Sequence, residues 1–182
     1  MKYIFYTMLS LFVLASCKTS KNYLSRSDSD NTIFDAVKTL KKYSTDTAAL
    51  NALPVLYNTA LQRNLRKINS YSSSRELSRW DKIIDGYNTL QEMHDAIIEV
   101  DAASRLVTPV DYRQTIYDLQ QQAAADYYTT AIDFLNRPGR DDAKKAYNYF
   151  KKADNWVPGY EDAKIKMDEA YDNAIVNVVI NP

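Results

Sequence analysis

Residues 127–160 read YYTTAIDFLNRPGRDDAKKAYNYFKKADNWVPGY, and this stretch decides the fold class. Apolar and small residues recur three and four positions apart, which is the period of an α-helix. Arg137-Pro138-Gly139 ends one helical segment, and Asp141 or Asp142 begins the next one. The stretch therefore predicts two helices joined by a short turn.

The same period extends outward over most of the chain and predicts an all-α fold of about six helices in antiparallel hairpins. Thr108-Pro109, followed by Asp111, is a typical helix start, and Pro158 predicts another. Pro54 must either kink its helix or begin a new one. The expected helices cover residues 32–40, 50–68, 80–98, 109–136, 141–157 and 158–174.

The composition excludes several classes of function. Three glycines are too few for a glycine-rich phosphate loop, and the single cysteine excludes an internal disulfide. Without residues 1–16, which contain one lysine, the charge is 22 − 23 = −1. A nearly neutral chain has no field that would attract nucleic acid, so no nucleic-acid partner is expected.

The N-terminus has the three parts of an export signal. Lys2 supplies the positive charge, residues 3–13 are mainly apolar, and Leu14-Ala15-Ser16-Cys17 closes the segment. The apolar part is too short to cross a hydrocarbon core of ~30 Å comfortably. One interpretation of these features is an ordinary signal peptide followed by an incidental cysteine.

Leu14-Ala15-Ser16-Cys17 resembles the lipobox of bacterial lipoproteins. The resemblance implies that residues 1–16 are removed and that Cys17 carries a diacylglyceryl anchor, with no other cofactor. Residues 17–31 are polar and are expected to be a flexible, lipidated tether. Lys18, where an aspartate would suggest inner-membrane retention, and the lack of a following acidic cluster favour a Bacteroidetes-like outer-membrane lipoprotein that faces the periplasm.

Residues 127–171 resemble a tetratricopeptide repeat (TPR). Ala146, Phe150, Ala153 and Pro158 have the spacing of its second helix and terminal proline, and residues 127–134 have that of its first helix. The turn is about three residues longer than the family pattern. An offset of 63 residues gives a weaker copy around Trp80–Leu90. We therefore expect a TPR-like domain over residues 32–174, with an unrelated helical bundle as the alternative.

The sequence contains few residues that could form a catalytic or metal site. His94 is the only histidine and lies on an apolar helical stripe, where a core or groove-edge histidine is expected. A zinc site of histidine and cysteine is nearly excluded, because the one cysteine is expected to be lipidated. The chain is therefore expected not to be an enzyme and to hold no metal.

The candidate partner-binding residues come from the repeat pattern and from one basic face. TPR proteins bind peptides or helices on the first helix of each pair, which implies Tyr128 and the aligned Leu65, with Asn64 and Tyr127. These tyrosines could instead pack hairpin against hairpin. Arg63, Arg66 and Lys67 form a small basic face that could contact an acidic partner or anionic lipid, or could simply be solvated.

The last residues, 175–182, do not follow the helical pattern. Their β-branched run predicts a short strand, which would have no partner in an all-α domain. Two explanations are open: the chain continues into a further domain, or the strand adds to a partner's sheet.

Together these features predict a membrane-tethered periplasmic scaffold or adaptor that binds envelope proteins. The alternative is a carrier or sensor for a small ligand, such as a glycan, a peptidoglycan fragment or a lipid, in a tyrosine-lined groove. An open concave face would favour the scaffold, and a closed pocket of a few hundred Å³ would favour the carrier.

Overall fold

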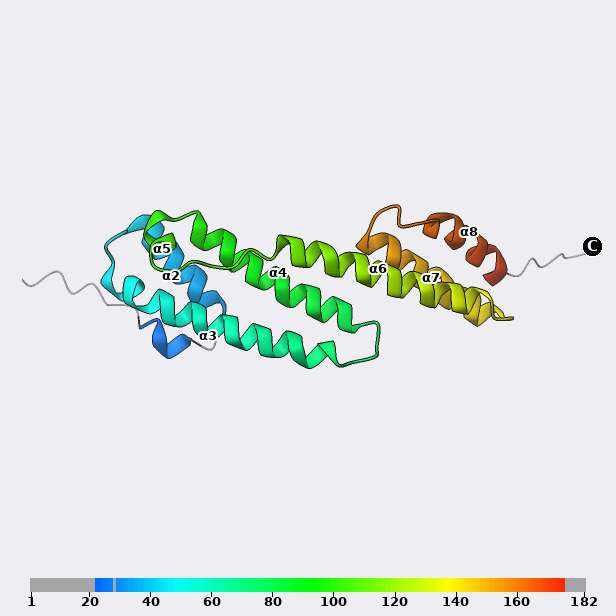
Figure 1. Cartoon of the computed structure of the whole chain (residues 1–182), viewed down its shortest axis with the longest axis horizontal. Coiled ribbons are helices and arrows are strands. Elements are labelled where there is room, and N and C mark those ends of the chain that lie inside the picture. Colours follow the sequence, from blue (N-terminus) through cyan, green and yellow to red (C-terminus); the bar gives the residue numbers. More distant parts are fainter. Residues whose placement is uncertain (1–21, 28, 176–182) are drawn as a thin grey trace, which may run out of the picture. The chain divides into compact units, whose positions relative to one another are not determined.

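The computed structural model describes residues 22–27 and 29–175, and these residues form an all-α fold (Figure 1). They contain no strand, one short 3-10 helix and seven α-helices. The helices are η1 (Leu24–Arg26), α2 (Asn31–Lys42), α3 (Thr47–Ser72), α4 (Arg79–Ile98), α5 (Asp101–Ser104), α6 (Arg113–Leu135), α7 (Arg140–Trp156) and α8 (Ala163–Ala174). The predicted all-α class is confirmed.

The chain divides into two compact units. Unit 1 comprises Met1–Leu61 and Asp95–Pro109, and unit 2 comprises Gln62–His94 and Val110–Pro182. Both α3 and α4 belong partly to each unit, because the boundaries fall inside these two helices.

The described part of unit 1 contains α2, the first half of α3 and the short α5, which pack together. One face of α2 is buried, as its apolar spacing requires, and it packs with α5. Asp46 precedes α3, and its Oδ1 accepts a hydrogen bond from Ala49 N at 2.9 Å, which satisfies one free N–H of the first turn. The buried apolar residues are Tyr23, Ile33, Ala36, Val37, Leu40, Ala49, Ala52, Leu53, Leu56, Tyr57, Ala60, Ile97, Val100, Ala103 and Val107.

Pro54 lies inside α3, which continues without interruption from Thr47 to Ser72. The alternative that a new helix begins at Pro54 is therefore wrong. Proline removes one backbone donor, and the buried neighbours Leu53 and Leu56 offset that loss by anchoring the helix on both sides.

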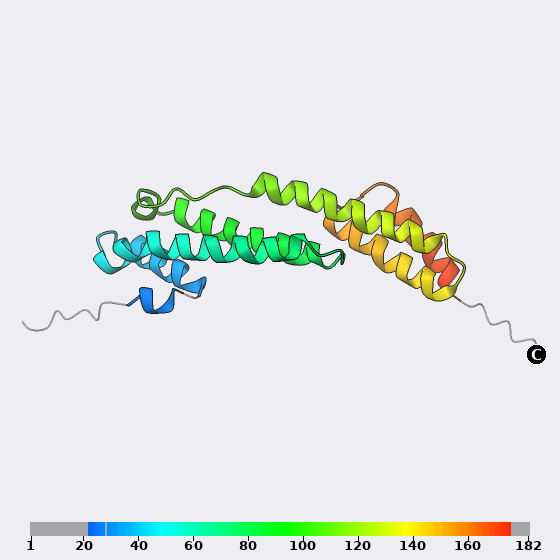
Figure 2. The ribbon, with the colours of Figure 1, turned by 60° about the horizontal axis from the view of Figure 1, so that its bottom comes forward.

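In unit 2, α6, α7 and α8 lie side by side (Figures 1 and 2). Their core consists of one large residue, Phe150, and four alanines, Ala131, Ala146, Ala163 and Ala170. Because alanine side chains are small, the helices approach closely, and the partly buried aromatics close the remaining gaps.

The second half of α3 packs against the first part of α4, also in unit 2. Gly86 is buried at this contact, and a Cβ atom there would lie 2.6 Å from Ile68 Cγ1. The close approach of the two helices therefore requires glycine at position 86.

Two predicted helix starts are wrong. α6 begins at Arg113 and not at Pro109, because the preceding backbone is held by side chains: Gln91 Oε1 accepts from Tyr112 N at 2.6 Å. α8 begins at Ala163 and not at Pro158, since Gly159 (φ 76°) and Glu161 (φ 44°) have left-handed backbone conformations that a right-handed helix cannot contain.

Of the predicted tether, residues 22–27 and 29–31 are described, and they include η1 and the start of α2. Tyr23 is buried, with 3% of its surface exposed. An aromatic ring within a mainly polar segment anchors it to the fold, which composition alone did not reveal.

The predicted signal peptide (1–16), Cys17 and most of the predicted terminal strand lie outside the described residues. Of residues 175–182 only Ile175 is described; it has extended backbone angles and follows α8. Within residues 22–27 and 29–175, no helix is both long and apolar enough to cross a membrane.

Candidate functional site

An open hollow of about 310 Å³ lies in unit 2 between α3, α4 and α6. Its wall combines apolar side chains with aromatic rings, one guanidinium group and two short polar groups. The lining residues are Ile68, Ser72, Arg79, Trp80, Ile83, Tyr87, Leu119 and Gln122.

One edge of the hollow is built by Arg79 and Trp80 at the start of α4. The Arg79 guanidinium lies 4.6 Å from the centre of the Trp80 ring. Asp126 of α6 holds both side chains: its Oδ2 accepts from Arg79 Nη2 at 2.6 Å and from Trp80 Nε1 at 3.0 Å. The Arg79 side chain is only 19% exposed, so this ion pair is better shielded from water than a typical surface pair.

The segment that leads into α6 is fixed to α4 near Tyr87. The Tyr87 and Tyr112 rings lie 5.2 Å apart in a tilted arrangement. Gln91 is buried and accepts from the Tyr112 N–H, while its Nε2 lies 3.1 Å from His94 Nδ1. Since Gln91 Oε1 already accepts the backbone N–H, its amide nitrogen donates to His94. His94 is thus a core histidine, as the apolar stripe predicted.

The predicted residues of α3 fall on different sides of the helix. Leu65 is half-buried and, by helical spacing, lies on the same face as Ile68 and Ser72, which line the hollow. Asn64 is buried with 6% exposure, so it is not a surface contact residue. Of the predicted basic face, Arg66 and Lys67 are exposed and Arg63 is half-buried.

Tyr127 and Tyr128 do not line this hollow. Tyr127 is 4% exposed, and its hydroxyl donates to Asp81 Oδ2 at 3.4 Å. Tyr128 packs edge-on against Phe150 and Tyr160 and donates to Asp162 Oδ1 at 2.5 Å. The structure thus places both tyrosines between helices, which was the alternative to a role in a binding groove.

The surroundings of these two hydroxyl groups oppose their ionisation. Burial, followed by the nearby Asp81 carboxylate, raises the pKa of Tyr127 to about 12. The hydrogen bond to Asp162, followed by burial, raises the pKa of Tyr128 to about 12. Both groups are therefore neutral hydrogen-bond donors at physiological pH and serve the packing of α6.

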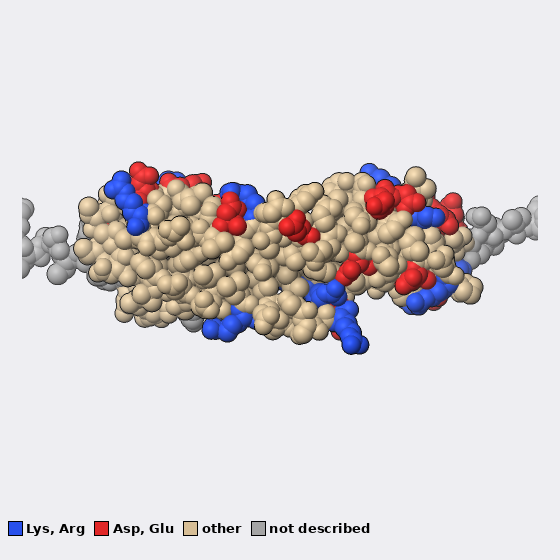
Figure 3. All heavy atoms as spheres, viewed as in Figure 1, with Lys and Arg blue, Asp and Glu red and all other residues tan. Residues whose placement is uncertain are grey.

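On the face shown in Figure 3, charged side chains lie in small groups, some mixed and some basic only, separated by uncharged surface. In the part of the chain that the structure describes, no group of three or more histidine, cysteine or acidic residues is placed to hold a metal ion.

Unit 1 carries two further hollows on either side of residues 44–45. One, of about 450 Å³, is lined by residues 42–48. The other, of about 480 Å³, is lined by Ser44, Thr45, Leu50, Asp101, Ala102, Arg105 and Leu106. The first wall is mainly polar and the second mainly apolar, and Tyr43 in the first is the one aromatic residue among those that line the two hollows.

The sequence interpretation missed most residues of the unit 2 hollow. Leu119 and Gln122 come from α6, and no local pattern pairs them with Trp80, Ile83 and Tyr87 of α4. The adjacent Arg79 and Trp80 at a helix start were an available signal, because arginine and tryptophan are both enriched in binding sites.

Comparisons of the chain with protein-family models, with curated proteins and with solved structures gave no match.

Proposed function

We propose that this chain is a scaffold or adaptor, tethered to the membrane by a lipid on Cys17, that binds envelope proteins and is not an enzyme. The observation that carries the proposal is the open hollow between α3, α4 and α6. The half-buried Arg79 and Tyr87 lie at this hollow, with the buried Trp80 in the wall beside them, and arginine and tyrosine are enriched among the residues that contribute most to protein–protein contacts.

The arrangement of these groups suits recognition of a helix or an extended peptide. Asp126 fixes Arg79 and Trp80 before any partner arrives, so little side-chain entropy is lost on binding. Arg66 and Lys67 are exposed on another side of α3, where they can contact an acidic partner or anionic lipid separately from the hollow. Confinement at the membrane raises the effective concentration of both proteins, so a modest affinity suffices.

The TPR-like arrangement belongs to the same proposal. It is supported by Ala131, Ala146 and Phe150, which occupy the small and aromatic positions of the repeat pattern and lie in one buried cluster with residues of α8. The aligned positions Ile83 and Ile84 of the weaker copy are also buried. Attachment at Cys17 and a location at the outer membrane facing the periplasm rest on Leu14–Cys17 and Lys18.

A carrier of a small ligand is the second candidate. The hollows of about 450 and 480 Å³ in unit 1 have the volume of small-ligand sites, roughly 300–1,000 Å³, and like the unit 2 hollow they are open to solvent. A ligand that protects unit 1 from thermal unfolding, in a chain that forms no protein complex, would support this candidate over the scaffold.

Site-specific photo-crosslinking in cells tests the scaffold proposal. A photoreactive amino acid is placed at Ser72 or Gln122, at the hollow, and at Lys151 on α7 as an equally exposed control. We expect the same discrete crosslinked protein from both hollow positions and none from position 151. Equal, diffuse labelling from all three positions would contradict a defined partner site at the hollow.

A further inference from the structure

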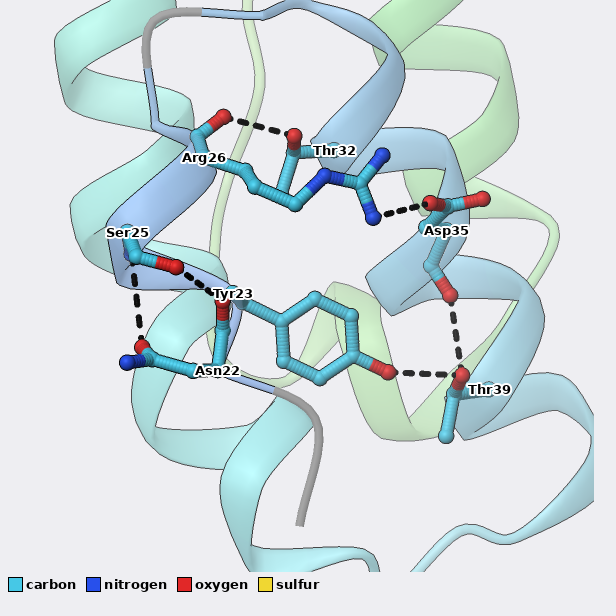
Figure 4. Close-up of polar contacts among 7 residues, drawn as sticks. All are labelled: Asn22, Tyr23, Ser25, Arg26, Thr32, Asp35 and Thr39. Carbon is cyan, nitrogen blue, oxygen red and sulfur yellow. Dashed lines mark hydrogen bonds and ion pairs between the residues drawn. The ribbon is translucent and has the colours of Figure 1, made fainter. Parts of the chain in front are cut away.

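Residues 22–27 are attached to α2 by side-chain contacts that the polar composition of this segment conceals (Figure 4). Tyr23 is 3% exposed, and its hydroxyl donates to Thr39 Oγ1 at 2.8 Å. The Thr39 hydroxyl in turn donates to the Asp35 carbonyl oxygen at 2.9 Å, so it accepts one hydrogen bond and donates another.

A second attachment lies one turn further along the chain. Thr32 is fully buried, and its hydroxyl donates to the Arg26 carbonyl oxygen at 2.7 Å. Arg26 also forms an exposed ion pair of 3.4 Å with Asp35, which adds little. Together, Tyr23–Thr39 and Thr32–Arg26 form what we call the N-terminal clamp, which holds η1 against α2.

The position of the clamp limits how far unit 1 can move from residue 17. Five residues, Lys18–Asn22, separate Cys17 from Tyr23. Six Cα–Cα steps span at most roughly 20 Å, even in a fully extended chain. If the tether ran to the start of α2 at Asn31, fourteen steps would span roughly 50 Å.

We infer that the N-terminal clamp holds unit 1 against the lipid headgroup layer, so that the bilayer surface is the second contact partner of this unit. The inference rests on the proposed lipid attachment at Cys17. The surface of η1 is suited to that contact because Leu24 is 50% exposed. The sequence between Cys17 and Tyr23 contains two lysines and no acid, a composition that favours anionic headgroups.

A matched pair of insertions tests the inference without disturbing the clamp. The mature form, residues 17–182, is coupled through Cys17 to a maleimide lipid in vesicles of phosphatidylethanolamine and phosphatidylglycerol. Coupling in vitro makes the result independent of whether cells lipidate Cys17, which is tested separately by fractionating cells that express the Cys17→Ser variant. A fluorescent amino acid at the exposed position Lys38 on α2 reports energy transfer to acceptor-labelled headgroups.

The same eight-residue Gly/Ser segment is inserted either between Lys21 and Asn22, before the clamp, or between Ser27 and Asp28, after Tyr23. We expect the first insertion to lower energy transfer by about twofold or more, because it more than doubles the maximum span between Cys17 and Tyr23. The second insertion should leave energy transfer unchanged, since the Tyr23–Thr39 contact still sets the distance.

An equal fall for both insertions, in proteins with unchanged helical circular dichroism, would overturn the inference. It would mean that the whole segment 18–30 acts as the tether and that the clamp does not hold on the membrane. No fall for either insertion would also overturn it, because the distance would then not depend on the length of the chain before Tyr23.

Discussion

At the scale of single residues, two polar side chains of unit 2, the buried Gln91 and the half-buried Asp126, act as connectors between helices. Gln91 joins the Tyr112 backbone N–H to His94, and Asp126 joins Arg79 to Trp80. Each connector satisfies two donors or acceptors that would otherwise lose water without compensation. Removing one connector therefore destabilises the fold through the loss of both of its hydrogen bonds.

Replacing Gln91 with alanine tests this role. Gln91→Ala removes two hydrogen bonds, one from the Tyr112 N–H and one to His94 Nδ1, so the free energy of unfolding should fall by about 1–3 kcal/mol. Urea denaturation measures the change, with the exposed Gln122→Ala as control. A loss in Gln91→Ala no larger than in the control would contradict the connector role.

The raised pKa of Tyr127 gives a second prediction at this scale. The pKa rises from 10.0 to about 12 on folding, so between these values the unfolded chain loses the phenolic proton while the native chain keeps it. Stability must therefore fall as pH increases over that range. Urea denaturation at several alkaline pH values should show that the free energy of unfolding falls less steeply with pH in Tyr127→Phe than in the parent chain. Equal slopes in the two proteins would contradict the prediction.

At the scale of helices, the contact between α3 and α4 depends on the lack of a side chain at Gly86. Gly86→Ala would gain helix propensity of up to ~1 kcal/mol. It would also place a Cβ 2.6 Å from Ile68 Cγ1, which sits on a stiff, β-branched side chain. We expect the overlap to dominate, with a net loss of about 1–2 kcal/mol.

A double-mutant cycle isolates this effect. In an Ile68→Ala background the obstructing atom is gone, so Gly86→Ala should become neutral or stabilising. Thermal unfolding of the four proteins gives the coupling. If Gly86→Ala costs the same in both backgrounds, the close approach of α3 to α4 is not what requires glycine.

The helices also show what local sequence can predict. The six long helices were predicted from their 3.6-residue period, because each buries one continuous face. The start of α6 was wrong because Gln91, 21 positions earlier, fixes Tyr112. The start of α8 was missed since the left-handed angle at Glu161 has no sequence signature, and the four-residue α5 is too short to show a period.

Pro54 offers a further test at this scale. Pro54→Ala restores a backbone donor in the middle of a continuous helix and should raise the free energy of unfolding by about 1–3 kcal/mol. Urea denaturation measures this change in the free energy of unfolding. The comparison is Ala52→Gly, which lowers helix propensity at a buried position of the same helix. A destabilised Pro54→Ala would show that the chain conformation around residue 54 needs the proline ring.

At the scale of the whole molecule, the proposed function combines a tether with a binding surface. The sequence predicted the tether from residues 1–17, but it placed the tether's end too late, because the burial of Tyr23 depends on Thr39 across 16 positions. Of the contact residues predicted from the sequence, Leu65 lies on the face of α3 that meets the hollow. The sequence interpretation missed Arg79, Leu119 and Gln122, since a surface made by three helices has no single periodic pattern.

The sharpest test of the tethered scaffold is the yield of the crosslinked species formed through Ser72 in living cells, compared between the parent chain and Cys17→Ser. We expect one discrete partner with the parent chain and a several-fold lower yield with Cys17→Ser, because loss of the anchor removes the confinement that compensates for modest affinity. An equal yield from both would contradict the tethered-scaffold account, and so would the absence of any partner at position 72.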